Sequence, residues 1–294
     1  MTHYFYLVCK KVLNKLGVSP PLLLALGVHK LRALKSDDYS FAGEFKELNE
    51  LTNQLGLKTG YAVDIAASDG LNQSSTYGFF KKHWAGLAIE MDPIKFSKLS
   101  YLYAEFENIR LARIRVTPQN ISSLLIAYEI QKNFTLLNLD IDSYDLRVVE
   151  EILNCGFAPQ IISMEINEKI PSGVFFTVEY DNDHYWQGDH FFGCSIDAAF
   201  MTLVKFNYVL YKLEWNNAIF ISPELASQHN ISSLEPAQAY NSGYKMRNNR
   251  KNIFPWNHDV ENWLNLSPEH AASAITKYFA KYEGKFTCIA TKDL

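Results

Sequence analysis

Paired cysteines are missing from this 294-residue sequence, whose four cysteines stand at positions 9, 155, 194 and 288 without C-x-x-C spacing. That spacing gives neither a zinc-ligand pattern nor a disulfide framework, so we expect reduced thiols in a cytoplasmic protein. An excess of basic residues is missing too, because 28 Lys and Arg stand against 32 Asp and Glu, for a net charge of −4. The chain therefore has no overall charge footprint for nucleic acid, and a small or neutral substrate suits it better.

Long hydrophobic runs are also lacking. Lysines interrupt the first apolar segment, and the second, near residues 20–31, is too short to cross a bilayer. No convincing signal-cleavage site follows either segment. Phe5, Val8, Val12 and Leu16 recur at helical spacing, which predicts a helix that lies on a membrane surface or packs on the core. Peripheral membrane contact stays open, whereas a transmembrane segment is not expected.

Strand-like segments, by contrast, alternate with helical ones. They are YAVDIA (61–66), GLAIEM (86–91), IRLARIRV (109–116), FTLLNLDI (134–141) and QIISMEIN (160–167). This order predicts five parallel strands joined by right-handed crossovers. Asn216 and Asn217 separate two later apolar segments, which predicts a closing hairpin. We therefore expect an α/β, Rossmann-like fold: a seven-stranded, mostly parallel sheet with a C-terminal antiparallel hairpin and helices on both faces.

Three parts of the chain are predicted: an N-terminal helical extension (1–55), a core (56–222) and a C-terminal extension (223–294) packed on the core. Within the core, we expect a polar, aromatic loop from Lys169 to His190. In the C-terminal extension, a basic and aromatic segment indicates either an anion site or a solvated connector. Its residues are Lys245, Arg247, Arg250, Lys251, Phe254 and Trp256.

Small residues follow the first strand in the stretch DIAASDG, from Asp64 to Gly70. They let a backbone approach a ligand closely, which is typical of a cofactor cradle, although a turn without a ligand has the same composition. Glu90 ends the second strand, where an acid can accept hydrogen bonds from both hydroxyls of a ribose. Both NAD and S-adenosylmethionine sites use such an acid, so Glu90 alone leaves both cofactors open.

Asp69 favours one of the two cofactors. A dinucleotide site typically has G-x-G-x-x-G, whereas this loop has one glycine and an aspartate in its middle. A carboxylate would repel a pyrophosphate and attract the α-ammonium group of a methionine. The loop therefore favours S-adenosylmethionine.

Four motifs of this sequence resemble those of a known family. VDIAASDG, GLAIEMDP, LLNLDIDSYD and IISMEIN are similar, in this order, to motifs of FkbM-type S-adenosylmethionine-dependent methyltransferases, and the resemblance covers about residues 61–221. It implies the class I methyltransferase fold. It also implies a cofactor site in which Glu90 holds the ribose hydroxyls. The methionine and ribose would be lined by Asp64, Ala66, Ser68, Asp69 and Gly70.

The sequence departs from the family at two places. Ala66 stands where the family usually has glycine, and no acid follows RIRVT to bind the adenine amino group. Backbone atoms near Val116 and Thr117 are the expected alternative for adenine.

Carboxylates gather where the fourth and fifth strands end. Asp140, Asp142 and Asp145 follow one strand, and Glu165 ends the other. Residues two apart on a strand share a face, so Asp140 and Asp142 would point to one site if the strand continued. Asp140, Asp142 and Glu165 are then candidate Mg²⁺ ligands, with Asp140 as catalytic base or ligand. The alternatives are helix capping by Asp142 or Asp145 and a buried ion pair for Glu165.

The loop EYDNDHYWQGDHFFGCS combines acids, histidines and aromatic rings. Aromatic faces with hydrogen-bonding groups suit a sugar or other polyhydroxyl acceptor. His184 or His190 is a candidate general base, since imidazole titrates near neutrality, although loop histidines are often plain surface residues.

Taken together, these patterns predict an S-adenosylmethionine-dependent O-methyltransferase that methylates a hydroxyl of a sugar or glycan, with Mg²⁺ as an optional cofactor. Two alternatives stay open: a methyltransferase-like scaffold without catalysis, and a nicotinamide-dependent sugar-modifying enzyme. Neither the oligomeric state nor the methylated hydroxyl is predicted.

Overall fold

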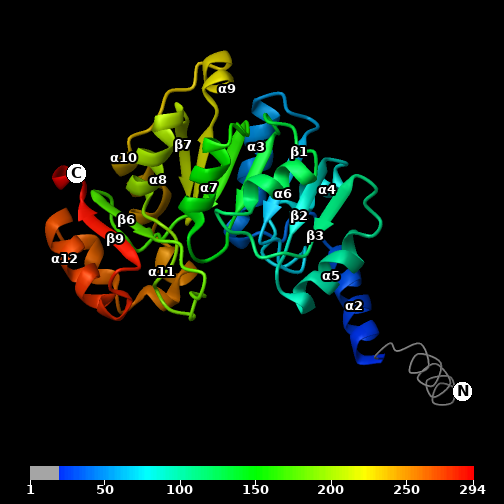
Figure 1. Ribbon diagram of the computed structural model, residues 1–294, viewed down its shortest axis with the longest axis horizontal. Helices are drawn as coiled ribbons and strands as arrows, with labels where there is room; N and C mark the ends of the chain where they lie inside the picture. The colour runs from blue at the N-terminus through cyan, green and yellow to red at the C-terminus, as the bar shows by residue number, and fades with distance from the viewer. Residues whose placement is uncertain (1–19) are drawn as a thin grey trace, which may run out of the picture.

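The computed structural model describes residues 20–294. The predicted helix through Phe5 and Leu16 lies outside the described residues. A twisted seven-stranded sheet crosses the middle of the molecule, and a smaller two-stranded sheet lies to one side of it (Figure 1).

The large sheet has the predicted composition of five parallel strands and an antiparallel hairpin. In spatial order its strands are β3 (Ile109–Ala112), β2 (Ala85–Ile89), β1 (Tyr61–Ile65), β4 (Leu136–Leu139), β5 (Ile161–Glu165), β8 (Asn217–Ile221) and β7 (Val209–Glu214). The chain order reverses between β1 and β4, so the ends of these two strands form the switch point where open α/β sheets bind ligands.

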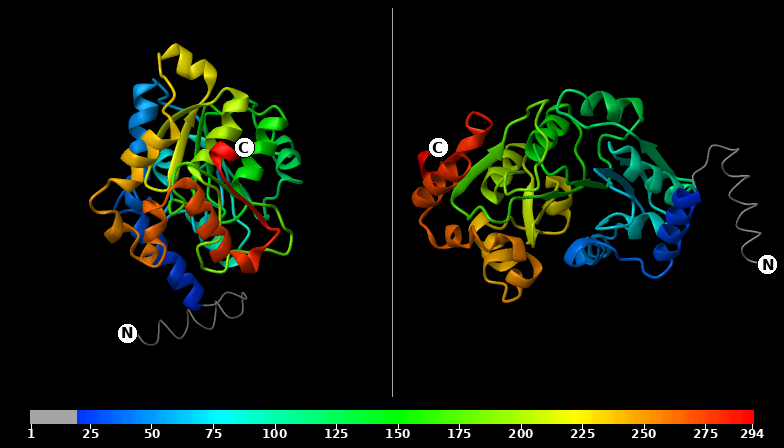
Figure 2. Two further views of the ribbon diagram at one scale, coloured as in Figure 1. Left: turned by 90° about the vertical axis from the view of Figure 1, so that its left-hand side faces the viewer. Right: turned by 90° about the horizontal axis from the view of Figure 1, so that it is seen from below.

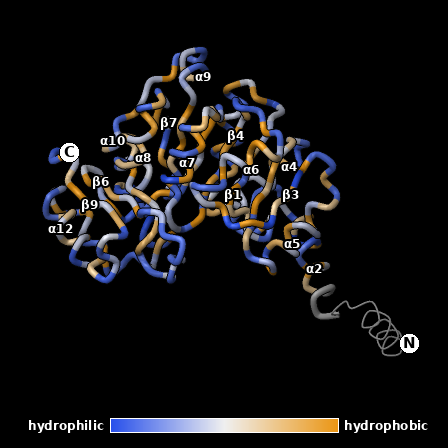
Figure 3. Tube along the Cα trace, viewed as in Figure 1, coloured by the Kyte–Doolittle hydropathy of each residue, from blue (hydrophilic) through white to orange (hydrophobic). Residues whose placement is uncertain are grey.

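Helices cover both faces of the sheet, as expected for strands joined by crossovers. On one face lie α6 (Ile121–Ala127), α7 (Asp145–Asn154), α8 (Ile196–Leu203) and α10 (Pro236–Tyr240). On the other lie α3 (Glu44–Gln54), α4 (Tyr77–Lys81), α5 (Pro93–Tyr103) and α9 (Pro223–Gln228), with α2 (Pro20–Ala33) beside α5. Successive residues of β1 serve the two faces, since Val63 and Ile65 pack in the first cluster and Ala62 in the second. Hydrophobic residues accordingly gather along the central strands of the trace (Figure 3).

Local sequence fixes several helix ends. Asp92 caps α5 by accepting hydrogen bonds from the N–H groups of Ile94 and Lys95, both at 2.8 Å. Ser195 caps α8 by accepting from Ala198 at 3.1 Å. Gly156, with φ of 77°, follows the last turn of α7 as predicted.

The predicted loop from Lys169 to His190 is wrong in part, because it contains β6 (Val174–Val178). This strand pairs antiparallel with β9 (Phe286–Ala290), more than a hundred residues later. With α12 (Pro268–Tyr278) the two strands enclose a separate apolar cluster, and this side module lies next to the hairpin edge of the large sheet (Figure 2). The predicted core (56–222) and the predicted C-terminal extension (223–294) thus each contribute one strand to this two-stranded sheet. The three predicted parts remain a prediction.

The remaining short elements connect these layers. They are η1 (Phe41–Gly43), η2 (Val204–Phe206), η3 (Asn241–Lys245), α11 (Arg250–Ile253), η4 (Pro255–Asn257), η5 (Glu261–Asn265), η6 (Ala280–Tyr282) and η7 (Thr291–Asp293). Across residues 20–294, no helix combines the length and the apolar character that crossing a membrane takes.

Candidate functional site

Two adjoining cavities open at the carboxyl ends of the parallel strands. The first cavity has a volume of about 320 Å³ and lies over β1, β2 and β4. The second cavity has a volume of about 230 Å³ and lies over β4 and β5, toward the C-terminal segment. Five residues line both: Glu44, Gln73, Asp140, Asp142 and Trp186. The two cavities are therefore halves of one site at the switch point of the sheet.

The loop after β1 forms one wall of the first cavity. Ala66 and Ser68 adopt left-handed backbone conformations, with φ of 67° and 53°. The N–H of Ser68 donates to Oε2 of Glu90 at 2.9 Å, and the N–H of Asp92 donates to Oε1 of the same carboxylate at 2.7 Å. Glu90 thus joins the ends of β1 and β2, and its buried carboxylate lines the cavity. Its role in binding a ribose stays a prediction.

Asp64 lies below this loop and also lines the first cavity. Its carboxylate accepts from the hydroxyl of Thr76 at 2.6 Å and from the amide of Asn138 at 2.9 Å. Burial raises its pKa, while these two hydrogen bonds act in the opposite direction. Asp64 therefore shapes the cavity floor through neighbours on two other segments.

Asp69 and Gly70 do not line either cavity, contrary to the cofactor contacts assigned to them. The Asp69 carboxylate turns back and accepts from the N–H groups of Leu71 and Asn72, at 3.1 and 2.8 Å. An added Cβ on Gly70 would meet the Leu99 side chain at 2.7 Å, so packing on α5 accounts for this glycine. An Asx turn and helix packing therefore account for both residues, and the sequence argument that Asp69 attracts an ammonium group fails.

The predicted adenine contacts are divided. Val116 lines the first cavity, but Thr117 does not, and the Thr117 N–H donates to Oδ1 of Asn120 at 2.8 Å. Ile114 and Arg115 line the wall instead. The segment after β3 thus borders the cavity at residues 114–116, which includes Val116 but not Thr117.

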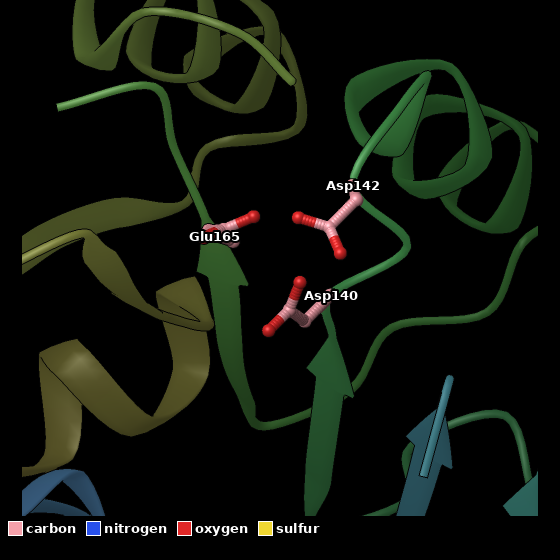
Figure 4. A group of neighbouring side chains, drawn as sticks. All are labelled: Asp140, Asp142 and Glu165. Carbon is pink, nitrogen blue, oxygen red and sulfur yellow. The ribbon is translucent and has the colours of Figure 1, made fainter. Parts of the chain in front are cut away.

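Asp140, Asp142 and Glu165 converge between the cavities. Each offers a carboxylate oxygen within 4.8 Å of the others, and their carboxylates point toward one another (Figure 4). Oε1 of Glu165 accepts from Nδ2 of Asn216 at 2.7 Å, whereas its Oε2 is buried without a hydrogen-bond partner. A buried carboxylate oxygen without a donor is costly, and a hard cation bound by oxygen ligands would relieve that cost.

The way in which these carboxylates meet differs from the prediction. β4 ends at Leu139, and Asp142 adopts a φ of 56°, so the chain turns after Asp140 instead of continuing as a strand. Asp145 holds this turn by accepting from the N–H groups of Ile141 and Ser143, at 2.8 and 3.0 Å. Neither Asp142 nor Asp145 caps α7, since its N-cap is Tyr144 without a side-chain hydrogen bond.

Electrostatics at this point disfavour three free carboxylates. The Asp140 side chain is surrounded by protein yet remains accessible to water through the cavities. Burial and the nearby Asp142 and Asp145 raise its pKa well above the usual range of aspartate. Burial and then Asp140 raise the pKa of Glu165 in the same way. The cluster therefore carries protons or a cation more readily than three isolated acids would.

The two candidate histidines occupy different surroundings. His184 lines the first cavity, packs edge-on against Phe191 and Tyr282, and keeps its Nε2 buried without a partner. Burial lowers its pKa, so its imidazole is neutral near pH 7. His190 lines neither cavity, and its Nε2 lies 3.0 Å from Oδ1 of Asp259. The structure thus brings His184 to the site and leaves His190 outside it.

Glu44 is a site residue that the sequence reading missed. It begins α3, lines both cavities, and accepts from Ser75 at 2.7 Å and from Asn217 at 2.5 Å. Burial raises its pKa to about 8. No motif marks it, and the one available signal is an acid at the first turn of an amphipathic helix, which ordinarily indicates a surface residue.

The basic residues of the C-terminal segment are largely paired with acids. Arg247 binds Glu214 through both terminal nitrogens, at 2.6 and 2.8 Å. Arg250 pairs with Glu261, and Lys251 lies 3.6 Å from the same carboxylate. These ion pairs leave little free charge for an anion, so the aromatic residues are the part of this segment that reaches the site.

No model of a known protein family matches this chain. No curated protein is significantly similar to it. The resemblance to FkbM-type enzymes therefore stays a prediction.

Solved structures with a similar arrangement include a protein from Klebsiella pneumoniae provisionally named an O-methyltransferase. Its identity is 12%, the match covers 73% of this chain and 96% of that one, and the TM-score is 0.41. The cofactor-bound protein Rv0187 from MTB matches with 12% identity, coverage of 73% and 95%, and a TM-score of 0.41.

A third match is to a protein from Pyrococcus horikoshii provisionally named an RNA methyltransferase, with 14% identity and a TM-score of 0.29. It covers 41% of this chain, and this chain spans just over half (56%) of that protein. At these values the likenesses assign no activity, which has to be argued from the site.

Proposed function

We propose that this protein is an S-adenosylmethionine-dependent O-methyltransferase of the FkbM type that methylates a hydroxyl of a sugar or glycan. The observation that carries the proposal is the pair of adjoining cavities with Asp140 in their shared wall. One cavity contains Glu90, the proposed ribose-binding acid, and the other contains aromatic rings. A reaction between two bound molecules requires such a wall, where the reacting atoms meet.

The first cavity fits the cofactor. Glu90 offers carboxylate oxygens beside a loop whose residues Ala66 and Ser68 also line the cavity. Val116 and Ile114 provide an apolar wall for a purine. When bound, S-adenosylmethionine supplies an electrophilic methyl group on a positively charged sulfur. The chain itself has to hold the ribose, orient the acceptor and take up a proton.

The same loop is less suited to a nicotinamide dinucleotide. In dinucleotide sites a helix begins directly after the first strand and directs its N–H groups at the pyrophosphate. Here α4 begins only at Tyr77, twelve residues after β1 ends, and it has five residues. The nicotinamide-dependent alternative therefore has little support from this cavity.

Asp140 is the proposed base. It lines both cavities and is accessible to water, so an acceptor hydroxyl in the second cavity can reach its carboxylate. With the cofactor bound, Asp140 would take up the proton of the acceptor hydroxyl as that hydroxyl is methylated.

The carboxylate cluster also fits a divalent cation. Asp140, Asp142 and Glu165 supply hard oxygen ligands, and the unpartnered Oε2 of Glu165 has the chemistry that such an ion satisfies. A bound Mg²⁺ would supply charge that favours the deprotonated form of a nearby hydroxyl. The proposal therefore includes a dependence of methyl transfer on a divalent cation, which substitutions in this cluster would test.

Cofactor binding is the first test. Calorimetric titration with S-adenosylhomocysteine should show binding to the wild type and none to Glu90→Ala, because the variant loses the ribose contact and the anchor of Ser68. Glu50→Ala, which removes an exposed glutamate of α3, should bind as the wild type does. Binding of NAD without binding of S-adenosylhomocysteine would overturn the proposal.

Turnover is the second test. With methyl glycosides as acceptors, Asp140→Asn should keep cofactor binding and lose about 100-fold or more in methyl transfer, as for removal of a general base. Full activity of this variant would remove Asp140 from the mechanism. Cofactor binding without methyl transfer to any acceptor hydroxyl would favour the scaffold without catalysis.

A further inference from the structure

Segments from distant parts of the chain build the second cavity. Phe41 comes from η1, Trp186 from the loop after β6, Phe192 from the segment before α8, and Phe254 and Trp256 from the segment around η4. The rings support one another: Phe41 and Phe254 pack edge to face at 5.4 Å, as do Phe254 and Trp256 at 5.6 Å. Trp186 and Trp256 stay 44% and 51% exposed, so their faces are available to a ligand.

Two buried hydrogen-bond acceptors in this cavity have no donor. They are Oε2 of Glu165 and Oδ1 of Asn216, on side chains more than nine-tenths buried. Nδ2 of Asn216 donates to Oε1 of Glu165 at 2.7 Å, which leaves its Oδ1 as the atom without a partner. Unsatisfied buried acceptors are rare in proteins because they are costly. Oδ1 of Asn216, which is not one of the candidate cation ligands, therefore suits a ligand that brings donors, such as hydroxyl groups.

The charges of the cavity select against anions. Among the described residues that line it, Lys169 carries the one positive charge, and its Nζ lies 3.2 Å from the Glu168 carboxylate. Both side chains are 98% buried, and their opposite charges cancel each other. Asp140, Asp142 and Glu165 face the same space. Without a bound cation, the described lining of this cavity therefore offers no unpaired positive charge to a phosphate, sulfate or carboxylate on the ligand.

The size of the cavity limits the ligand further. Its volume of about 230 Å³ is below the range of roughly 300–1,000 Å³ that holds drug-sized ligands. A single six-membered ring fits such a space better than two linked rings do. Tryptophan faces suit the C–H face of a sugar ring, whose hydroxyls then face the polar wall that Glu165 and Asn216 form.

We propose that the second cavity is the acceptor site and takes one uncharged sugar unit between Trp256 and the Glu165–Asn216 pair, excluding phosphorylated and acidic sugars. This inference rests on the proposed methyltransferase function, for which it names the acceptor class. Its hydroxyl lies toward Asp140, which borders both cavities. Phe41, Phe254 and Trp256, which line this cavity, lie outside the stretch 61–221 that resembles a known family.

The test is saturation-transfer NMR on the wild-type protein with S-adenosylhomocysteine present and divalent cations removed by EDTA. The probes are methyl glycosides of common hexoses and 6-deoxyhexoses, with glucose 6-phosphate and glucuronic acid as the anionic set. At least one neutral glycoside should bind more tightly than every anionic probe. Preference for an anionic probe, or no neutral binding at tens of millimolar, would overturn the proposal.

Variants locate the binding. Trp256→Ala changes a half-exposed side chain and should weaken binding of the neutral glycoside about fivefold, because the stacking on the tryptophan ring is lost. Asn216→Ala should weaken it by a similar factor through a lost hydrogen bond. Tyr101→Ala, an exposed aromatic of α5 outside both cavities, is the matched control and should bind as the wild type does.

Cofactor affinity separates the two proposals. If every protein, the wild type included, fails to bind S-adenosylhomocysteine, the methyltransferase proposal is wrong. If all bind it and the Trp256→Ala and Asn216→Ala variants keep wild-type affinity for the glycoside, the acceptor site lies elsewhere. If the Asn216→Ala variant does not fold, it will also fail to bind S-adenosylhomocysteine. The Trp256→Ala variant alone then decides whether the second cavity is the acceptor site.

Discussion

The guanidinium group of Arg115 donates a hydrogen bond to the backbone carbonyl of His184 at 3.1 Å. The same group donates to the carbonyl of Asn182 at 2.5 Å and stacks on the Tyr185 ring, 4.3 Å from its centre. Arg115 follows β3, and the loop that it holds follows β6, so one side chain fastens the loop across the first cavity. A planar guanidinium with several donors is suited to holding several carbonyls at once.

Arg115→Ala should release this loop. Without the guanidinium, the amides of residues 181–186 should exchange hydrogen faster, and cofactor affinity should fall about tenfold because one cavity wall loosens. Hydrogen exchange followed by mass spectrometry measures the first effect and calorimetry the second. In both measurements Arg115→Lys should lie between the wild type and Arg115→Ala, since an ammonium group cannot donate to all of these partners. Wild-type exchange in the loop of Arg115→Ala would show that other contacts hold it.

Ala66→Gly should stabilise the protein. A non-glycine residue in the left-handed region carries a strain of about 1 kcal/mol, which glycine avoids. We expect the free energy of unfolding, measured with urea, to rise by about that amount, with cofactor affinity unchanged. The neighbouring Ala67→Gly is the control, and it should destabilise the protein because Ala67 is buried and not left-handed. Equal effects of both variants would contradict the strain at Ala66.

Glu44 should make stability fall as pH rises. Its pKa is about 8 in the folded protein and about 4.5 in the unfolded chain, so between these values only the folded state holds the proton. The free energy of unfolding therefore decreases over this window, by at most about 1.4 kcal/mol per pH unit from this group. Urea unfolding at a series of pH values measures the slope.

Glu44→Gln should flatten that slope between about pH 4.5 and 8, because the amide does not titrate. Ser75→Ala should extend the decrease to higher pH, since the hydroxyl of Ser75 donates to the Glu44 carboxylate and favours its charged form. A Glu44→Gln profile identical to that of the wild type would assign the pH dependence to other groups.

Asp142→Asn should have opposite effects on stability and on cation binding. Without a cation, removing one of three clustered carboxylates lessens their repulsion and should raise the unfolding temperature. With Mg²⁺ or Mn²⁺, the wild type should gain thermal stability and the variant should not, because it lacks a ligand. Asp183→Asn, an exposed aspartate outside both cavities, should behave as the wild type. A cation-induced shift retained in full by Asp142→Asn would exclude this cluster as the binding site.

Local sequence was sufficient for the acids at the ends of strands. Glu90, Asp140 and Glu165 each follow a short apolar segment, and the carboxyl ends of parallel strands meet at one edge. Strand identity and order therefore predict that such side chains lie together. The meeting of Asp140 with Asp142 was also expected, but the extended strand proposed for it was wrong, since a turn at Asp142 produces it.

Tertiary packing decided the direction of side chains in loops and the contacts between distant segments. Asp69 could have faced a cofactor, but hydrogen bonds to the next residues turn it away from the cavity. The strand β6 could not be predicted from its local sequence, because its partner β9 lies more than a hundred residues away.

The sequence by itself therefore determined the α/β class, the five parallel strands with their hairpin, and the acids at the strand ends, because these depend on periodicity and on short-range order. Only the tertiary structure decided that Glu44, Asn216 and Trp256 border the same site as Asp140. Their positions depend on how segments far apart in the chain bury their apolar faces, which no local pattern encodes.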